Sequence, residues 1–314
     1  VTSAAVRLAR AFTGRKKVLC CGYHGWHDWY ISVTDRDRGI PEAIEDLSYT
    51  FEYNDLAALE RVIDDDVACV VLEPVTFEAP APGFLQGLRA LCSARGVVLV
   101  FDEMWTGFRI ALGGAQAHFG VQADLATFSK AVANGMPLSV LSGRREIMRL
   151  LERDVFFFTT YGGEALSLAA AQVTIEKLRD RRVPEHIARL GARVLEGVAA
   201  ISSEEKTPYV KAIGLPYRTQ LTFDPAAADA LLQKSFVQQE LLRRGVLWNG
   251  FHNLSLAHTD KDVDYLLECY REIFALLRDG IERADLIQRL RGEKLEPVFR
   301  RTTKFHTRPK PESA

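Results

Sequence analysis

The chain has 314 residues, of which 47% are hydrophobic and 26% charged, and its net charge is −1. This length predicts two domains, and the balanced charge argues against a nucleic-acid-binding protein, which would show a basic bias. No apolar run approaches the roughly 20 residues that a membrane span needs. The five cysteines have no paired spacing, so we expect free thiols, buried at Cys69 and Cys92, and a cytoplasmic protein.

Residues 1–17 are rich in arginine and contain no acid, a composition that a transit peptide shares. Val6, Leu8 and Phe12 also form the apolar stripe of a surface helix that Gly14 would end. We favour the helix, because no small-residue cleavage site precedes the next strand. The chain begins at Val1 rather than Met, from which we expect a fragment of a longer protein.

Strands and helices alternate over the first 183 residues. Apolar runs predict strands at 18–21, 67–72, 97–101, 125–129, 138–141 and 156–158, and helical periodicity predicts helices at 55–63, 85–94 and 164–179. Asn54 is the predicted N-cap of the first of these helices. This alternation predicts an α/β domain with a mostly parallel sheet. The polar, aperiodic residues 26–46 predict a lid.

The composition changes after residue 183. Helices at 185–200, 228–244 and 260–278, with short strands at 217–223, 246–248 and 254–257, predict a small α+β domain over residues 184–282. Residues 283–314 are basic, and we expect a mostly solvated tail, with one more packed helix near 286–290 as the alternative.

Two predicted strands of the first domain each end in a charge, Asp102 after 97–101 and Lys130 after 125–129. Ligands of open α/β sheets bind at this edge. A buried lysine amine has a lowered pKa and attacks carbonyls. An aldehyde cofactor with a basic ring nitrogen requires such a lysine and a carboxylate, which describes pyridoxal phosphate. The alternative is a pair of solvated strand-end charges.

Two further residues fit this interpretation. Tyr23 lies in a loop flanked by glycines and has the flat aromatic ring needed to stack on a cofactor. Thr160 precedes Gly162-Gly163 and a predicted helix, whose N-terminal amides favour a phosphate.

The motifs YHGWHD, VVLEPV, VLVFDEMWTGFR, ALGGAQAHFGVQADLATFSK, NGMP and TTYGGEALSLAAA resemble, in this order, the class-III aminotransferases. Within that family the chain is most similar to the glutamate-1-semialdehyde 2,1-aminomutase-like branch, over roughly residues 1–280. The resemblance implies the PLP-dependent transferase fold type I, pyridoxal 5′-phosphate (PLP) as the cofactor, and amino-group transfer through a lysine aldimine. The implied substrate is a small amine, amino acid or semialdehyde.

The resemblance also implies the catalytic pair and the oligomer. Lys130 matches the lysine of the aldimine, and Asp102 matches the carboxylate paired with the pyridine nitrogen. Thr160 matches the threonine that reaches the phosphate in the neighbouring subunit, which implies a homodimer.

Four cofactor contacts follow from the same resemblance. Tyr23 matches the aromatic residue that stacks on the cofactor ring. His24 matches the residue that supports this aromatic residue. Glu73 matches an acid near the site, and Met104 an apolar residue packed under the ring.

Three departures from the family pattern weaken parts of this interpretation. The phosphate-binding turn and the N-terminal segment of the family would precede Val1. Glu164 and Ala165 stand where the family has asparagine and proline, and residues 249–253 lack the glutamate of true aminomutases. An incomplete or non-catalytic homologue that binds PLP weakly or not at all is therefore the alternative, and transaminase, aminomutase and epimerase activities stay open.

Other chemistries have less support. His24, His27 and Asp28 have metal-ligand chemistry, as do the three acids at 64–66, but no further ligand is clustered with either set, and we predict no metal site. The sequence contains no GxGxxG after a strand, no P-loop and no GxSxG. Arg109 is expected to bind either a substrate carboxylate or a structural acid.

Overall fold

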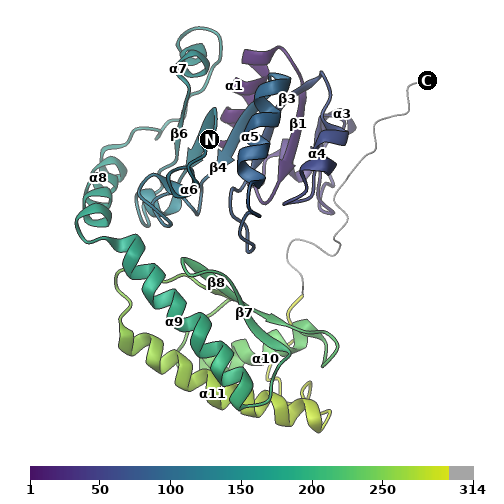
Figure 1. Cartoon of the computed structure of the whole chain (residues 1–314), viewed down its shortest axis with the longest axis vertical. Helices are drawn as coiled ribbons and strands as arrows, with labels where there is room; N and C mark the ends of the chain where they lie inside the picture. The colour runs from purple at the N-terminus through teal and green to yellow at the C-terminus, as the bar shows by residue number, and fades with distance from the viewer. Residues whose placement is uncertain (297–314) are drawn as a thin grey trace. The chain divides into compact units, whose positions relative to one another are not determined.

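The computed structural model describes residues 1–296 and divides the chain into two compact units. Of the described residues, the large unit comprises 1–76 and 80–181, and the small unit comprises 77–79 and 182–296. Figure 1 shows the six-stranded sheet of the large unit and, separately, the long helices and short strands of the small unit.

The large unit is built on a sheet of order β2-β1-β3-β4-β5-β6. Its strands are, in chain order, β1 (Lys17–Cys21), β2 (Ser48–Thr50), β3 (Val67–Leu72), β4 (Val98–Asp102), β5 (Leu125–Phe128) and β6 (Val140–Gly143). The first five are parallel, and β6 pairs antiparallel with β5 at the edge. Every residue of β3 and β4 is buried, as expected for strands covered on both faces. The α/β fold class is thus confirmed.

Alternate residues of the central strands enter two separate cores. On one face Cys69 and Val71 pack with the helix α1 (Thr2–Thr13), which ends as predicted at Gly14 with φ 69°. On the other face Val70 and Leu72 pack with α4 (Leu56–Val62) and α5 (Phe84–Arg95) (Figure 1). The remaining elements of this unit are α2 (Asp28–Ile31), α3 (Glu42–Glu45), α6 (Gly114–Phe119), η1 (Lys130–Val132), α7 (Arg145–Met148), η2 (Arg149–Glu152) and α8 (Ala165–Asp180).

Two predictions about local structure in the large unit are wrong. Residues 156–158 form no strand, and Phe156 and Phe158 are 77% and 73% exposed, because the chain has already left the sheet after its edge strand β6. The N-cap of α4 is Asp55, whose carboxylate accepts from Ala58 N at 2.8 Å. Asn54 instead has φ 65° and accepts from the distant Ala81 N.

The predicted lid is wrong at residues 29–34, which are largely buried, whereas for residues 35–46 it stays a prediction. Trp29, Tyr30 and Val33 lie in the core beneath α1, since their large apolar surfaces find partners there. Aperiodic polarity elsewhere in residues 26–46 concealed this short buried stretch.

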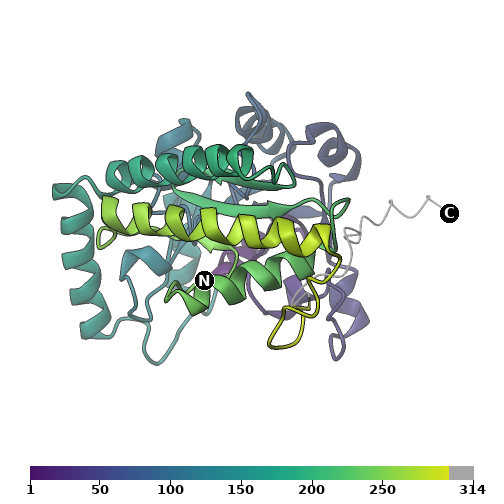
Figure 2. The same ribbon diagram turned by 90° about the horizontal axis from the view of Figure 1, so that it is seen from below.

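The small unit has an antiparallel sheet of β7 (Val210–Leu215), β8 (Arg218–Phe223) and β9 (Phe251–His252). Its helices are α9 (Val183–Glu204), α10 (Ala230–Arg243) and α11 (Asp260–Glu282), and α9 and α11 lie side by side (Figure 2). The prediction missed β7 and placed strands at 246–248 and 254–257, where the structure has none. β7 was missed because its residues do not alternate cleanly.

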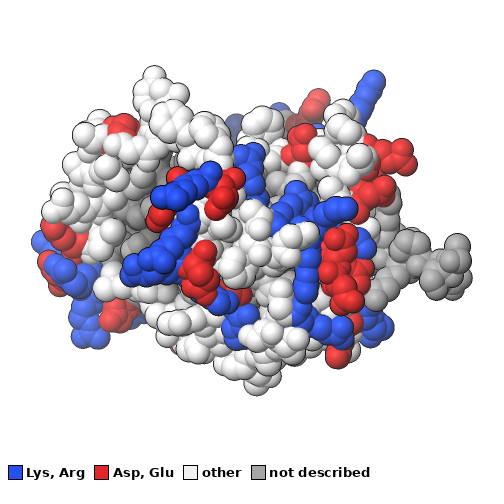
Figure 3. Space-filling view, turned by 90° about the horizontal axis from the view of Figure 1, so that it is seen from above, with Lys and Arg blue, Asp and Glu red and all other residues white. Residues whose placement is uncertain are grey.

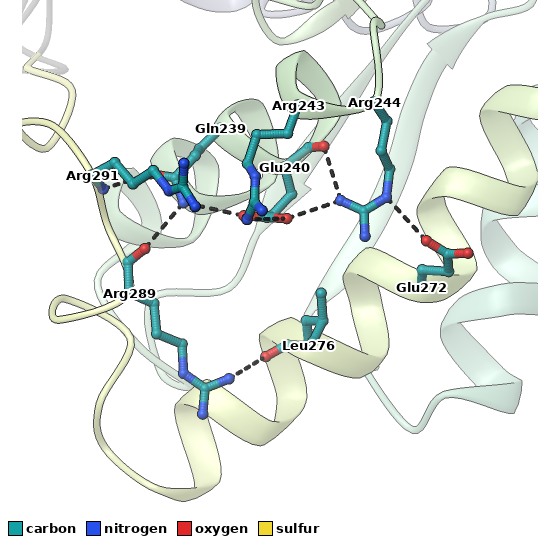
Figure 4. Close-up of polar contacts among 8 residues, drawn as sticks. All are labelled: Gln239, Glu240, Arg243, Arg244, Glu272, Leu276, Arg289 and Arg291. Atoms are coloured by element: carbon teal, nitrogen blue, oxygen red, sulfur yellow. Dashed lines mark hydrogen bonds and ion pairs between the residues drawn. The ribbon is translucent and has the colours of Figure 1, made fainter.

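Most residues of the first part of the predicted tail, 283–296, are exposed as expected, but this part also packs on the small unit, and it forms turns rather than a helix. Leu286 is buried, and the side chain of Gln239 on α10 bonds to Arg289 O at 3.0 Å and accepts from Arg291 N at 2.7 Å (Figure 4). The buried carboxylate of Glu240, next along α10, pairs with the guanidinium of Arg244 at 2.9 Å. Residues 297–314 of the predicted tail lie outside the described residues.

Positive and negative side chains are not segregated on the face of the molecule that Figure 3 shows. Lys and Arg side chains are intermingled with Asp and Glu on the face shown in Figure 3. No helix among residues 1–296 is both long and apolar enough to cross a membrane.

Candidate active site

Four neighbouring strands place one ionisable residue each at or just beyond their carboxyl ends. In sheet order these strands are β1, β3, β4 and β5, and the residues are His24, Glu73, Asp102 and Lys130. Asp102 ends β4 and lies opposite Thr127 of the adjacent strand β5, and Lys130 follows Thr127 by three residues, just beyond the end of β5. The prediction that Asp102 and Lys130 share one sheet edge is confirmed. We call the four residues the strand-end row.

Lys130 is exposed, so the expectation of a buried amine is wrong. The residue lies beyond the last residue of β5, where the backbone adopts φ 48° and turns out of the sheet into η1. Its positive charge still acts on Glu73, whose pKa is raised chiefly by burial and which Lys130 stabilises slightly in the charged form.

Asp102 and His24 form a buried pair, with side chains 1% and 0% exposed. His24 Nδ1 lies 2.8 Å from Asp102 Oδ2, and His24 Nε2 lies 3.1 Å from the carbonyl oxygen of Cys21. Both ring nitrogens therefore face oxygen atoms, one of the carboxylate and one of the backbone. The other carboxylate oxygen, Oδ1, accepts from Met104 N at 3.1 Å. The pair thus holds the carboxylate in a fixed orientation and out of contact with solvent.

Glu73 supports the loop that follows β1. Its Oε2 accepts from Tyr23 N at 2.9 Å, while the ring of Tyr23 is 44% exposed. Gly22 has φ 107°, and a Cβ there would lie 2.7 Å from that same oxygen, so only glycine fits. Burial raises the pKa of Glu73, and the negative charge of Asp102 raises it further. His24, the Tyr23 N–H and Lys130 partly offset this rise. Glu73 therefore takes up a proton more readily than a solvated glutamate.

The other predicted residues lie as follows. Met104 is half-buried and is joined to the pair through its backbone. Thr160 is exposed on the turn before α8, and its role toward a neighbouring subunit stays a prediction. Glu164 caps α8 by accepting from Ser167 N and Leu166 N, so the departure from asparagine preserves a helix cap.

Sequence reasoning missed Glu103, whose carboxylate is completely buried. It accepts from Thr106 Oγ1 at 2.6 Å, Ala115 N at 2.7 Å and Gln116 N at 3.0 Å, and it thereby caps α6. Burial raises its pKa, although these donors oppose the shift. The available signal was the DExxT spacing, which places an acid and a hydroxyl three residues apart beside Asp102.

The metal interpretations of the sequence find no geometric support. Within residues 1–296 no three His, Cys, Asp or Glu side chains are grouped so that they could hold a metal ion. Both nitrogens of His24 are already engaged. All five cysteines are free and buried, and burial raises the pKa of Cys69 and Cys92 to about 12.

Comparison with known proteins agrees with this geometry. The model of the class-III aminotransferase family matches residues 2–260, and the chain belongs to that family. A 3-aminobutyryl-CoA aminotransferase from Cloacimonas acidaminovorans (strain Evry) is 36% identical over 287 residues, which cover 87% of this chain and 68% of the relative.

Solved structures show the same fold. The PLP internal aldimine form of the FumI protein of Sphingopyxis sp. MTA144 is 30% identical with a TM-score of 0.81, over 90% of this chain and 69% of that one. A glutamate-1-semialdehyde-aminomutase from Pseudomonas aeruginosa PAO1 is 26% identical with a TM-score of 0.77, and the match covers 88% of this chain and 70% of that one. The chain has the PLP-dependent transferase fold type I, and it is a PLP-dependent aminotransferase.

The strand-end row fits PLP. A buried carboxylate oriented by His24 and Met104 N suits a protonated pyridine nitrogen, and an exposed amine just beyond the next strand suits an aldehyde. The exposed ring of Tyr23, held from behind by Glu73, offers a flat face.

Proposed function

We propose that this protein moves an amino group between a small amine or amino acid and a carbonyl compound, with PLP held covalently by Lys130. The observation that carries the proposal is the strand-end row. A buried, histidine-supported carboxylate at the end of β4 and an amine just beyond the end of the adjacent strand β5 lie at the edge where such sheets bind ligands.

Each residue of the row has a distinct role in this proposal. PLP, when bound, supplies a ring that accepts the electron pair left at the substrate carbon. Asp102 keeps a proton on the ring nitrogen, and His24 orients Asp102. The amine of Lys130 first holds PLP and then takes up and returns the proton at the substrate carbon. Tyr23 stacks on the ring, and Met104 packs against it.

Intermolecular transfer is the function we favour over intramolecular transfer. The 36% identical relative is named an aminotransferase, and residues 249–253 lack the glutamate expected of aminomutases. An aminomutase-like activity is the second candidate, supported by the motif resemblance and by the 26% identical aminomutase structure.

We further propose a homodimer in which Thr160 reaches the phosphate site of the neighbouring subunit. The turn that carries Thr160 is exposed and is flanked by the exposed aromatic residues Phe158 and Tyr161, which suits an interface. A cytoplasmic location is proposed from the free cysteines.

The test is a half-reaction. The PLP-loaded chain is mixed with a panel of amines, amino acids and semialdehydes, and the visible absorbance of the cofactor and the carbonyl product are followed. Loss of the absorbance with one released carbonyl product per site supports amino-group transfer. Isomerisation of a semialdehyde without released carbonyl product supports the aminomutase-like alternative. A chain that takes up no PLP, or takes it up and reacts with no donor, contradicts the proposal.

A further inference from the structure

Helix α2 places a tyrosine directly behind the candidate site. Tyr30 is 1% exposed, and its hydroxyl donates to Gly22 O at 2.8 Å. Gly22 begins the turn that carries Tyr23 and His24. The buried hydroxyl therefore contacts the turn on which the stacked ring and the support of Asp102 both depend.

The ring of Tyr30 contacts both of those residues. Its plane stands edge-on to Tyr23, with centroids 5.7 Å apart at 89°, and edge-on to His24, at 5.3 Å and 79°. Trp29, the preceding residue of α2, stacks on His24 at 5.9 Å and 19° and donates from Nε1 to Ser3 Oγ at 3.1 Å. Edge-to-face and offset-stacked arrangements are favourable geometries for such rings.

The turn is bound from a second direction as well. Glu73 Oε2 accepts from Tyr23 N, and the hydroxyl of Thr2 on α1 donates to His24 O at 3.1 Å. Among these contacts the hydroxyl of Tyr30 holds the glycine whose φ of 107° sets the direction of the turn. We expect that loss of this donor weakens the hold on the Gly22 carbonyl and shifts the two side chains that follow it.

We propose that Tyr30 is a positioning residue that aligns the ring of Tyr23 and the His24–Asp102 pair at the same time. This inference rests on the proposed function of the strand-end row. Tyr30 acts through Gly22, Tyr23 and His24, and its burial keeps it away from substrate.

The test compares Tyr30→Phe, which keeps the ring and removes the hydroxyl, with Tyr49→Phe. Tyr49 likewise donates its hydroxyl to a backbone carbonyl, Asp46 O at 2.9 Å, but lies on β2 away from the row. We expect Tyr30→Phe to raise the dissociation constant of PLP about three- to tenfold, as the loss of one hydrogen bond predicts. It should also weaken the visible circular dichroism of the bound cofactor and lower kcat, with KM for the amino donor unchanged.

Tyr49→Phe should match the wild type in all these measurements. The thermal unfolding midpoint of each variant separates positioning from general stability, and Tyr30→Leu, which also removes the ring edges, should enlarge the spectroscopic change. The inference is overturned if Tyr30→Phe differs from wild type only in its unfolding midpoint, or if it matches Tyr49→Phe throughout. In either case, if the wild type still binds PLP, the proposed function stands and only the role of Tyr30 is contradicted. If the wild type binds no PLP, both the proposed function and the role of Tyr30 are contradicted.

Discussion

The pair of Asp102 and His24 is the most constrained feature of the site at the scale of single residues. Burial of a carboxylate is costly unless hydrogen bonds compensate, and here both carboxylate oxygens are bonded, one to His24 and one to Met104 N. Such an arrangement is stable only where the surrounding groups are fixed, which is also what an electrostatic catalyst requires.

Asp102→Asn tests this role. The amide keeps the size of the side chain but lacks the negative charge that holds a proton on the ring nitrogen. We expect kcat to fall by about 100-fold or more while PLP is still taken up, in line with the loss of one preorganised electrostatic contact. Steady-state kinetics and exchange of the substrate proton with solvent measure the effect.

Asp124→Asn is the matched control. Asp124 is also a buried aspartate next to β5, but it precedes the strand, at the opposite end, and pairs with Arg89 and Arg144. This variant should lose stability and keep its turnover per folded site. Equal turnover in the two variants would remove Asp102 from the proposed chemistry.

Sequence alone identified the members of the strand-end row but not their contacts. The abrupt end of an apolar run in Asp102, and of a second in Lys130, predicts a shared sheet edge, because parallel neighbours end together. The bond from His24 to Asp102 spans 78 positions, and no local pattern encodes it. The exposure of Lys130 was likewise unpredictable, since it depends on a single left-handed backbone angle after β5.

At the scale of elements, Glu103 joins the end of β4 to the start of α6. Its backbone N–H donates to Thr127 O of β5, and its carboxylate binds two amide groups and one hydroxyl. Gly114 is required here, because a Cβ would lie 2.3 Å from the Glu103 carboxylate. The loop between Asp102 and α6 is therefore shaped by one buried acid.

Glu103→Ala should lower the free energy of unfolding by about 3–5 kcal/mol, because it leaves three buried donors without their acceptor. Urea unfolding followed by circular dichroism measures the loss. Asp55→Ala, which removes the single-bond cap of α4, is the control and should cost about 1 kcal/mol. Similar losses in both variants would contradict the role assigned to Glu103.

Helices and strands were predicted correctly where an apolar pattern extends over many residues. The predictions failed where tertiary contacts determine the secondary structure. The central strands and α1, α5, α8, α9 and α11 were predicted at nearly their observed positions, because each has a continuous apolar run or stripe. Residues 156–158 have the composition of a strand but no neighbouring strand to pair with. The short helix α2 was taken as part of a lid because two buried aromatic residues are too few to show a period.

At the scale of the whole molecule, the exposed aromatic residues around Thr160 have a testable consequence. Phe156, Phe158 and Tyr161 are 77%, 73% and 78% exposed, and Leu166 at the start of α8 is 65% exposed. Apolar surface of this kind is costly in water and marks an interaction site. We propose that a second copy of the chain covers it.

The double variant Phe156→Ser/Phe158→Ser should shift the sedimenting species from dimer toward monomer and weaken PLP binding, since Thr160 would no longer meet the neighbouring site. Leu247→Ser is the control, because Leu247 is 92% exposed in the small unit. Sedimentation velocity measures the proportions of dimer and monomer in each variant. A monomeric wild type, or a double variant that stays dimeric, would contradict the proposed interface.

Covalent trapping with a reductant shows which lysine holds the cofactor, which we propose to be Lys130. The PLP-loaded chain is reduced with borohydride, digested and mapped by mass spectrometry, alongside Lys130→Ala and the control Lys261→Ala, whose lysine is exposed at the start of α11. We predict that the pyridoxyl group is found on Lys130 in the wild type and in Lys261→Ala, and on no lysine in Lys130→Ala. Trapping on another lysine, or unchanged trapping in Lys130→Ala, would contradict the account.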